Sequence, residues 1–163
     1  MALIAHLQYS NDIIGTNSFA EVGELDVSEM SEVYQYSHEI YSPIDLNIGA
    51  VQGARVHHPL SVTKPVDAAS APLYQALCMS ETKDEFVLHF FRADPSGVEV
   101  EYWTITMTGV KVAAIRPILP NVKDEKLLPV PLMEVVEFLY QEITWAHSEG
   151  YEYLDVWVQP PGA

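Results

Sequence analysis

The sequence predicts a mainly β fold, a sandwich or a barrel, with one short α-helix. Apolar and polar side chains alternate with a period of two, which is the dominant pattern along the chain. Turn-forming residues separate the alternating runs. One segment, residues 65–78, instead has apolar residues at helical spacing. Many strands with turns between them are typical of sheets that pack or close around one core.

The length and composition bound the class of protein. A chain of 163 residues fits one domain, residues 1–163, and is long enough to bury a core. Hydrophobic residues make up 48%, and no apolar run approaches the roughly 18 to 20 residues of a membrane span. We therefore expect a soluble protein with no membrane partner. The N-terminal run MALIAHLQYSND has no Lys or Arg, and its apolar run is too short for a secretory signal.

Three strands are expected before the helix, at residues 2–9, 33–41 and 56–63. The helix comes next, and either Asp67 or Ser70 is its expected N-cap. Its few turns do not form a stable helix in isolation, so it must pack on the sheet with its apolar face inward. That face contains Leu73, Ala76 and Leu77. Cys78, the only cysteine, excludes an intrachain disulfide and is expected to be a small buried apolar side chain on this helix.

The most clearly predicted element is the β-hairpin after the helix. In EFVLHFFR, residues 85–92, alternate side chains point to opposite faces. The turn DPSG, residues 94–97, is followed by the return run VEVEYWTITMTGV, residues 98–110. Two later strands are expected at residues 110–115 and 153–158.

The run PLMEVVEFLYQEITWAH, residues 131–147, fits either a helix or a strand. Val135, Phe138 and Leu139 have helical spacing, and Pro131 suits a helix start. Many β-branched and aromatic residues favour a long, bent strand instead. Periodicity does not decide between the two for a short apolar run.

Two segments interrupt the strands and carry apolar residues that look exposed. Residues 42–53, SPIDLNIGAVQG, are broken by Pro and Gly, and residues 116–131, RPILPNVKDEKLLPVP, by four prolines. Such loops either cover a core or bind a partner, and the residues alone favour neither. The apolar residues are Ile44, Leu46, Ile48 and Val51 in the first segment and Ile118, Leu119, Leu127 and Leu128 in the second.

The net charge of −15 excludes one class of partner. No Lys or Arg follows Lys126, whereas six acidic residues do. Affinity for nucleic acid depends on Lys and Arg, so we expect no nucleic-acid partner. Negative charges also repel one another between copies of the chain. Self-assembly must therefore place the carboxylates in solvent or beside cations of a neighbour.

No catalytic or metal-binding constellation is recognisable, and no cofactor is expected. His57 and His58 are adjacent on a strand, point to opposite faces and cannot both bind one cation. There is no phosphate-binding loop and no nucleophile elbow. A sugar platform is conceivable, but the surrounding strands favour a place in the core or an interface for the three tryptophans, Trp103, Trp145 and Trp157.

Four features occur in a definite order along residues 55–147. They are R-x-H-x-P-L-x-x-T-K before the helix, A-P-L-Y-Q-A-L within it, F-R-x-D-x-x-G in the hairpin and Y-x-x-I-x-W-x-H near the end. Because these four features occur in this order, the chain resembles the haemolysin-coregulated protein (Hcp) family, whose members are the subunits of the type VI secretion tube. The first 50 residues match the family only loosely.

The resemblance implies a β-barrel of two sheets with one short α-helix packed at its side, as in phage tail tubes, and a strand at residues 131–147. It also implies a homohexameric ring, stacked into a tube inside a contractile sheath. A spike protein would sit at the tube tip, and small effector proteins would lie in the ring lumen. Such a subunit is not an enzyme. It is cytoplasmic before assembly and is then secreted without a signal peptide.

Contacts between subunits are expected at Ile44, Leu46, Ile48, Val51 and Arg55. Two other classes of function remain open. A carbohydrate-binding β-sandwich would present Tyr and Trp on one exposed face. A small secreted hydrolase would need a His brought together with an acid or Ser by the fold.

Overall fold

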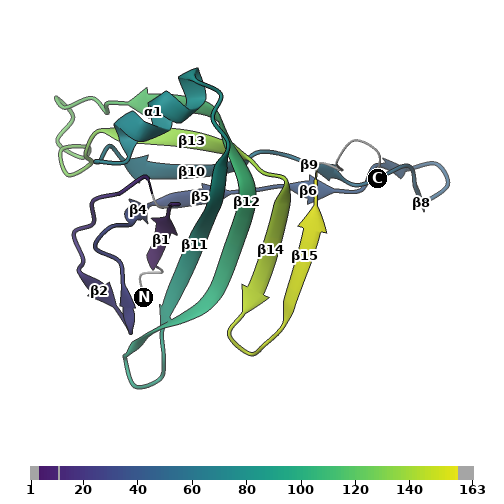
Figure 1. Ribbon diagram of the computed structural model, residues 1–163, viewed down its shortest axis with the longest axis horizontal. Coiled ribbons are helices and arrows are strands. Elements are labelled where there is room, and N and C mark those ends of the chain that lie inside the picture. The colour runs from purple at the N-terminus through teal and green to yellow at the C-terminus, as the bar shows by residue number, and fades with distance from the viewer. Residues whose placement is uncertain (1–3, 11, 158–163) are drawn as a thin grey trace.

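The computed structural model describes residues 4–10 and 12–157. Ala2, Leu3 and Val158, at the ends of two predicted strands, lie outside this part of the chain. It contains one helix, α1 (Ser70–Cys78), within a mainly β architecture (Figure 1). The strands are β1 (Ile4–Gln8), β2 (Glu21–Val22), β3 (Leu25–Asp26), β4 (Ser31–Val33), β5 (Gln35–Ser37), β6 (Ile40–Tyr41), β7 (Ile44–Asp45), β8 (Ala50–Val51), β9 (Val56–His57), β10 (Leu60–Pro65), β11 (Lys83–Ala93), β12 (Glu99–Ile118), β13 (Met133–Leu139), β14 (Glu142–His147) and β15 (Glu152–Val156).

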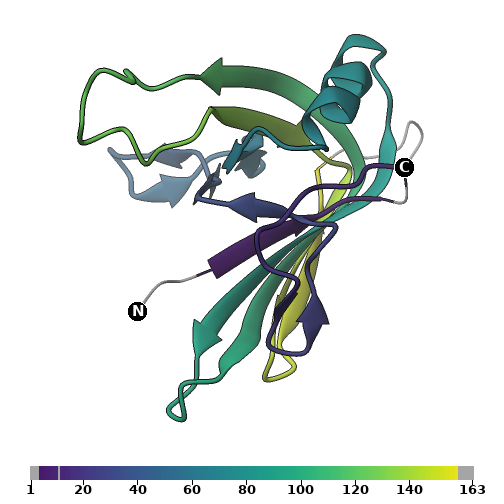
Figure 2. The ribbon, with the colours of Figure 1, turned by 90° about the vertical axis from the view of Figure 1, so that its left-hand side faces the viewer.

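The main sheet closes on itself (Figure 2). Its strand order is β4-β1-β11-β12-β13-β10-β5, and its two end strands, β4 and β5, are separated in the chain only by Tyr34. The backbone N–H of Tyr34 donates to the carbonyl of Thr63 in β10 (2.8 Å). One short segment therefore pairs first with β1 and then with β10, and this closes the barrel. The predicted mainly β barrel with one helix at its side is confirmed.

The long strand β12 belongs to both walls of the barrel, one containing β11 and β14 and the other containing β13 and β10. Its first half pairs with β14, and its second half pairs with β13. Gly109 lies at the change, with a φ of +60° that favours glycine. A register shift between Val112 and Ala114 adds a bulge just beyond it. The bend allows one strand to pass from the first wall to the second (Figure 1).

The two faces of the predicted hairpin enter two apolar clusters. Phe86 and Leu88 lie in the main core, where Phe86 packs edge-on against Phe138 with ring centroids 5.4 Å apart. Phe91 instead packs in a smaller cluster under the β2–β3 hairpin, with Val22, Val27 and Met30. Trp103, Trp145 and Trp157 are partly buried against the main core, as predicted for core-filling residues. Full burial of one such large apolar side chain contributes about 1.5–3 kcal/mol.

The helix packs with the predicted residues inward: Leu73 and Ala76 are buried, and Leu77 is half-buried against the core. The predicted N-cap is wrong. Ala69 occupies that position without a side-chain cap, because Asp67 and Ser70 are engaged in a buried polar cluster. The prediction of a buried Cys78 is also wrong. Cys78 follows Ala76 by two residues, about 200° around the helix, and therefore faces solvent.

The ambiguous run at residues 131–147 consists of two strands, β13 and β14, so the predicted strand is confirmed with a break at Tyr140 and Gln141. β13 lies between β12 and β10, and alternate residues of it, Glu134, Val136 and Phe138, are buried there. In the part of the chain that is described, no helix is long and apolar enough to cross a membrane.

Candidate functional site

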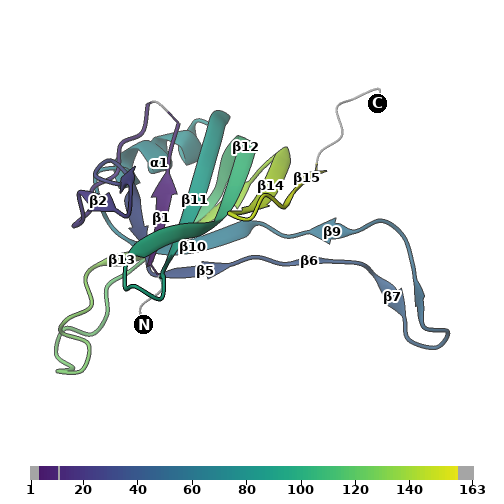
Figure 3. The same ribbon diagram turned by 90° about the horizontal axis from the view of Figure 1, so that it is seen from below.

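The segment at residues 42–53 is the tip of a long arm that leaves the barrel (Figure 3). The arm comprises residues 38–57 and forms two short antiparallel ladders. Next to the barrel β6 pairs with β9, and further out β7 pairs with β8, with Ile44 opposite Val51. Among the described residues, no hydrogen bond or ion pair connects the tip to the barrel.

The tip exposes the four apolar residues singled out from the sequence. Leu46 is 86% exposed and Ile48 is 71% exposed, and Ile44 and Val51 are exposed as well. These side chains therefore do not cover the core, which removes one of the two interpretations of this loop. An exposed apolar group that projects away from the fold is typical of an interaction site.

The tip has a defined shape without help from the core. The Gln52 backbone N–H donates to the carbonyl of Pro43 (2.7 Å), and that of Gly49 donates to the carbonyl of Asp45 (2.9 Å). The Asp45 carboxylate accepts from the Asn47 backbone N–H (2.8 Å) and from the Gln52 side chain (3.1 Å). Gly49 has a φ of +63°, as this turn requires.

Arg55 and His57, on the returning strand of the arm, bind one carboxylate of the last strand, β15. Nε and Nη2 of Arg55 each lie 2.5 Å from an oxygen of Asp155. Nε2 of His57 lies 2.8 Å from Asp155 Oδ2. Hydrogen bonds from the Arg55 guanidinium hold the pKa of Asp155 below its usual value. Arg55 remains about half exposed, with 47% of its side chain accessible.

The hydroxyl of Tyr140 bridges both strands of the arm. It lies 2.9 Å from Nε2 of His38, on the outgoing side, and 2.7 Å from Nδ1 of His57, on the returning side. Trp145 stacks on His38, and Trp157 stacks on His57. Burial lowers the pKa of His38 to about 4, with a further contribution from His57, and burial raises the pKa of the Tyr140 phenol. We call six of the residues at the base of the arm the root cluster. They are His38, Arg55, His57, Tyr140, Asp155 and Trp157.

The second apolar segment, residues 116–131, also projects into solvent, at the opposite end of the molecule from the arm (Figure 3). It joins β12 to β13 and exposes Ile118, Leu119, Leu127 and Leu128. These residues do not cover the core either.

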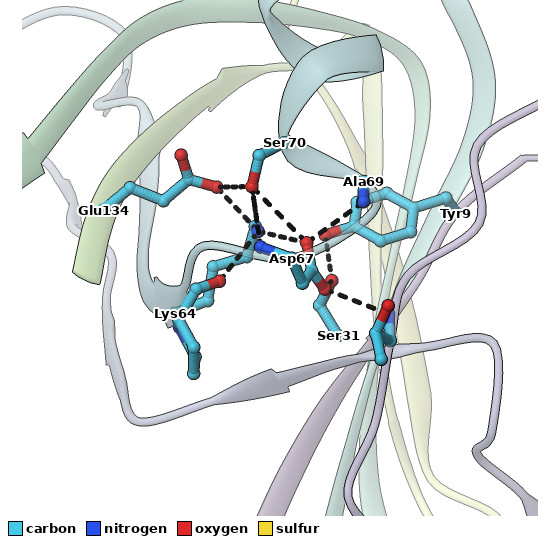
Figure 4. Close-up of polar contacts among 9 residues, drawn as sticks. Tyr9, Ser31, Lys64, Asp67, Ala69, Ser70 and Glu134 are labelled. Atoms are coloured by element: carbon cyan, nitrogen blue, oxygen red, sulfur yellow. Dashed lines mark hydrogen bonds and ion pairs between the residues drawn. The ribbon is translucent and has the colours of Figure 1, made fainter. Parts of the chain in front are cut away.

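A fully buried polar cluster joins the start of the helix to the barrel wall (Figure 4). Lys64 Nζ lies 2.6 Å from Glu134 and 2.7 Å from Asp67, and neither Lys64 nor Glu134 is accessible to solvent. The hydroxyl of Ser70 donates to Glu134 (2.7 Å). Asp67 also accepts from Ser31, whose hydroxyl in turn accepts from Tyr9 (2.7 Å). These contacts attach the helix start to the barrel wall, while Glu134 Oε2 is buried without a hydrogen-bond partner among the described residues.

The geometry provides little for catalysis. No group of three or more metal-ligating side chains occurs among the residues that the structure describes. His57 lies beside an acid, but its other ring nitrogen meets a tyrosine, and no Ser or Cys within the described chain is hydrogen-bonded to it. His57 and His58 face opposite ways, as predicted, since His58 stacks on Tyr41 instead. The tryptophans pack against the core and do not form an exposed platform.

Comparison with known proteins decides the family. The family model described as "Type VI secretion system effector, Hcp" matches residues 17–147. The chain belongs to the Hcp family. The "Major exported protein" of Pseudomonas aeruginosa, over an alignment of 159 residues, is 30% identical to this Hcp chain, covering 97% of this chain and 90% of that protein.

Solved Hcp structures have the same fold. An Hcp1 mutant from E. coli EAEC 042 is 27% identical, with a TM-score of 0.78 and coverage of 96% of this chain and 98% of that one. A crystal structure of an Hcp protein has a TM-score of 0.82 at 23% identity and covers 98% of this chain and 100% of that chain. The family resemblance seen in the sequence is confirmed, and it extends beyond residues 55–147.

The root cluster of this Hcp chain was missed by sequence reasoning. The R-x-H spacing contained part of the signal, because Arg55 and His57 must share one face of a strand. Their partner, Asp155, lies 100 residues from Arg55 in the chain. Only the pairing of β14 with β15 brings it to the arm.

Proposed function

We propose that this chain is a structural subunit of a type VI secretion tube, not an enzyme, and that it forms hexameric rings that stack. The observation that carries the proposal is the arm, whose tip is ordered by its own hydrogen bonds yet exposes Ile44, Leu46, Ile48 and Val51. An isolated subunit gains nothing from keeping four apolar side chains in water. A second copy that covers them gains about 1.5–3 kcal/mol for each side chain fully buried.

Arg55 belongs to the same proposed set of contacts. Its guanidinium is paired with Asp155 in its own chain but stays half exposed, so it can also meet a carboxylate of a neighbour. In a chain with a net charge of −15, such a cation reduces repulsion where two copies meet.

The partners proposed beyond other copies are a spike protein at the tube tip, a contractile sheath around the tube and small effector proteins in the ring lumen. The family supports these partners. The route would be assembly in the cytoplasm followed by export through the type VI apparatus. Neither a glycan-binding module nor a hydrolase is favoured by any contact in the described residues.

The test is the assembly state of the purified protein and of a double variant, Leu46→Ser with Ile48→Ser. We expect the parent to form annular particles by size-exclusion chromatography and negative-stain imaging, and to form stacks at high concentration. The double variant should lose stacks or rings while its circular dichroism stays native, because both side chains are exposed and the tip has no hydrogen bond or ion pair to the barrel among the described residues.

Met79→Ser is the matched control, since Met79 is 70% exposed but lies one residue past the end of the helix, outside both apolar segments. It should assemble like the parent. A parent protein that stays monomeric at every concentration and salt would overturn the proposed tube function. A double variant that assembles normally would remove the arm tip from the interface.

A further inference from the structure

We propose that the root cluster is a positioning device that sets the direction of the arm relative to the barrel, with the Tyr140 hydroxyl and the Asp155 carboxylate as its two anchors. Its importance for assembly depends on the proposed function, in which the arm contacts another copy. The positioning itself does not, because it is a property of one chain.

The arm has no other support within the described residues. Its tip makes hydrogen bonds only to itself, and the strands of its two ladders pair only within the arm, β6 with β9 and β7 with β8. A two-stranded ribbon attached at one end swings about its base unless something fixes that base. The direction of the arm is therefore decided where its two strands enter the barrel.

Both strands are bound at that point, and they are bound through shared groups. Tyr140, in the break between β13 and β14, contacts His38 of one strand and His57 of the other through a single hydroxyl. Asp155 of β15 contacts His57 and Arg55. Arg55 Nη2 also donates to the carbonyl of Val156 (3.1 Å), so the returning strand is connected to β15 at two points.

The hydrogen bonds form a connected chain when both rings are neutral. An ionised Asp155 can only accept, so Nε2 of His57 must donate to it. Nδ1 of His57 is then the acceptor for the Tyr140 hydroxyl, whose oxygen accepts from Nε2–H of His38. Removal of the Tyr140 hydroxyl alone breaks two hydrogen bonds, one to each strand of the arm. Phe keeps the aromatic ring, which packs against both His57 and Trp157.

The experiment measures the distance between one spin label on the arm and one on the barrel. The background is Cys78→Ser, and labels are attached at Asn47→Cys in the tip and Glu85→Cys on β11, both exposed positions. Labelled chains are mixed with a large excess of unlabelled Cys78→Ser chains, so that only distances within one chain are recorded. Conditions that prevent stacking keep partners from holding the arm.

We expect one narrow distance distribution in the parent. Tyr140→Phe, Asp155→Asn and Arg55→Gln should each broaden it and remove the parent peak. Arg55→Gln is the variant expected to stay folded even if the other two do not, because it changes a half-exposed side chain outside the core. The matched control is Glu137→Gln, which removes another arginine–carboxylate pair, Arg116–Glu137, on the barrel wall. It should leave the distribution narrow.

A narrow, unshifted distribution in all three root variants would overturn the inference. Stacking, measured on the same variants, separates this result from the proposed function. Broad distributions with normal stacking would support the positioning device and contradict the contact role of the arm. Broad distributions with lost stacking and intact rings would support both.

Discussion

Two titratable side chains, Lys64 and His6, are buried where an isolated charge is costly. Lys64 is fully buried, and it is tolerated there because Glu134 and Asp67 lie within 2.7 Å of its ammonium group. His6 is buried too, and one of its ring nitrogens lies 2.7 Å from the side chain of Asn17. In both cases the cost of burial makes stability sensitive to a change in one partner.

Lys64→Met should reduce the free energy of unfolding by about 3–5 kcal/mol, because it leaves two carboxylates buried without their cation. Urea denaturation at a fixed protein concentration measures the change. Lys83→Met is the matched control. Its partners, Asp12 and Glu81, are more exposed, and such ion pairs contribute about 1 kcal/mol or less. Equal losses in the two variants would contradict a special role for the buried pair.

Stability should fall as the pH is lowered from 6.5 towards 4. Burial lowers the pKa of both His6 and His38 from 6.5 to about 4 in the folded state. Between these values the unfolded chain binds protons that the folded chain does not, so acid favours unfolding. The contribution is complete above pH 6.5 and is lost as the pH approaches 4. His6→Gln should flatten this part of the curve, measured by urea denaturation across the pH range. An unchanged slope would mean that His6 does not contribute.

At the scale of elements, the helix depends on the barrel for its existence. It has nine residues, no side-chain cap and no basic residue in its last turn, and so it has little intrinsic stability. Its place is decided by Leu73 and Ala76, which are buried, and by the polar cluster at its start. The arm tip is the opposite case, because it is ordered by local hydrogen bonds and its apolar side chains are exposed.

Leu73→Ala should cost about 2–5 kcal/mol of unfolding free energy, through lost burial and the cavity left under the helix. Met79→Ala, one residue past the end of the same helix and exposed to solvent, should change stability by about 0.5 kcal/mol or less. Thermal and urea unfolding of the two variants provide the comparison. If Leu73→Ala were as mild as Met79→Ala, the helix would not be packed as described.

For the whole molecule, the distribution of charge sets the conditions of assembly. The net charge is −15, and the arm tip includes a single carboxylate, Asp45, and no cation. Three of the six acidic residues after Lys126 are paired with a cation within the chain, Glu134 with Lys64, Glu137 with Arg116 and Asp155 with Arg55. Most of the negative charge therefore stays on the surface, where it repels other copies.

Ring stacking should strengthen as salt rises. Repulsion between rings acts over long distances, and at physiological ionic strength charges more than about 8 Å apart are already largely screened. Ring closure, which places apolar groups in direct contact, should depend on salt less. Light scattering across a salt series measures stacking. A steady decrease from low to high salt would show that attractive ion pairs dominate.

The local structure was determined by the sequence by itself. The hairpin at residues 85–110, the helix and the break in the strands at residues 42–53 were all predicted, because alternation, turn chemistry and Pro or Gly breaks act between near neighbours. Residues 131–147 were ambiguous on the same grounds, and only pairing with β12 and β10 made β13 a strand.

Only the tertiary structure decided which charges are neutralised and where the arm is anchored. Lys64 meets Glu134 because β10 pairs with β13, and Arg55 meets Asp155 because β15 lies beside β14 at the base of the arm. Such partners are far apart in the chain, so no local pattern records them. Cys78 is exposed for a local reason, its angular position on the helix, but the uncapped helix start has the same tertiary cause, because Asp67 and Ser70 bind Lys64 and Glu134. The chain around this helix start satisfies packing and burial of the whole barrel first, and local preference yields where the two conflict.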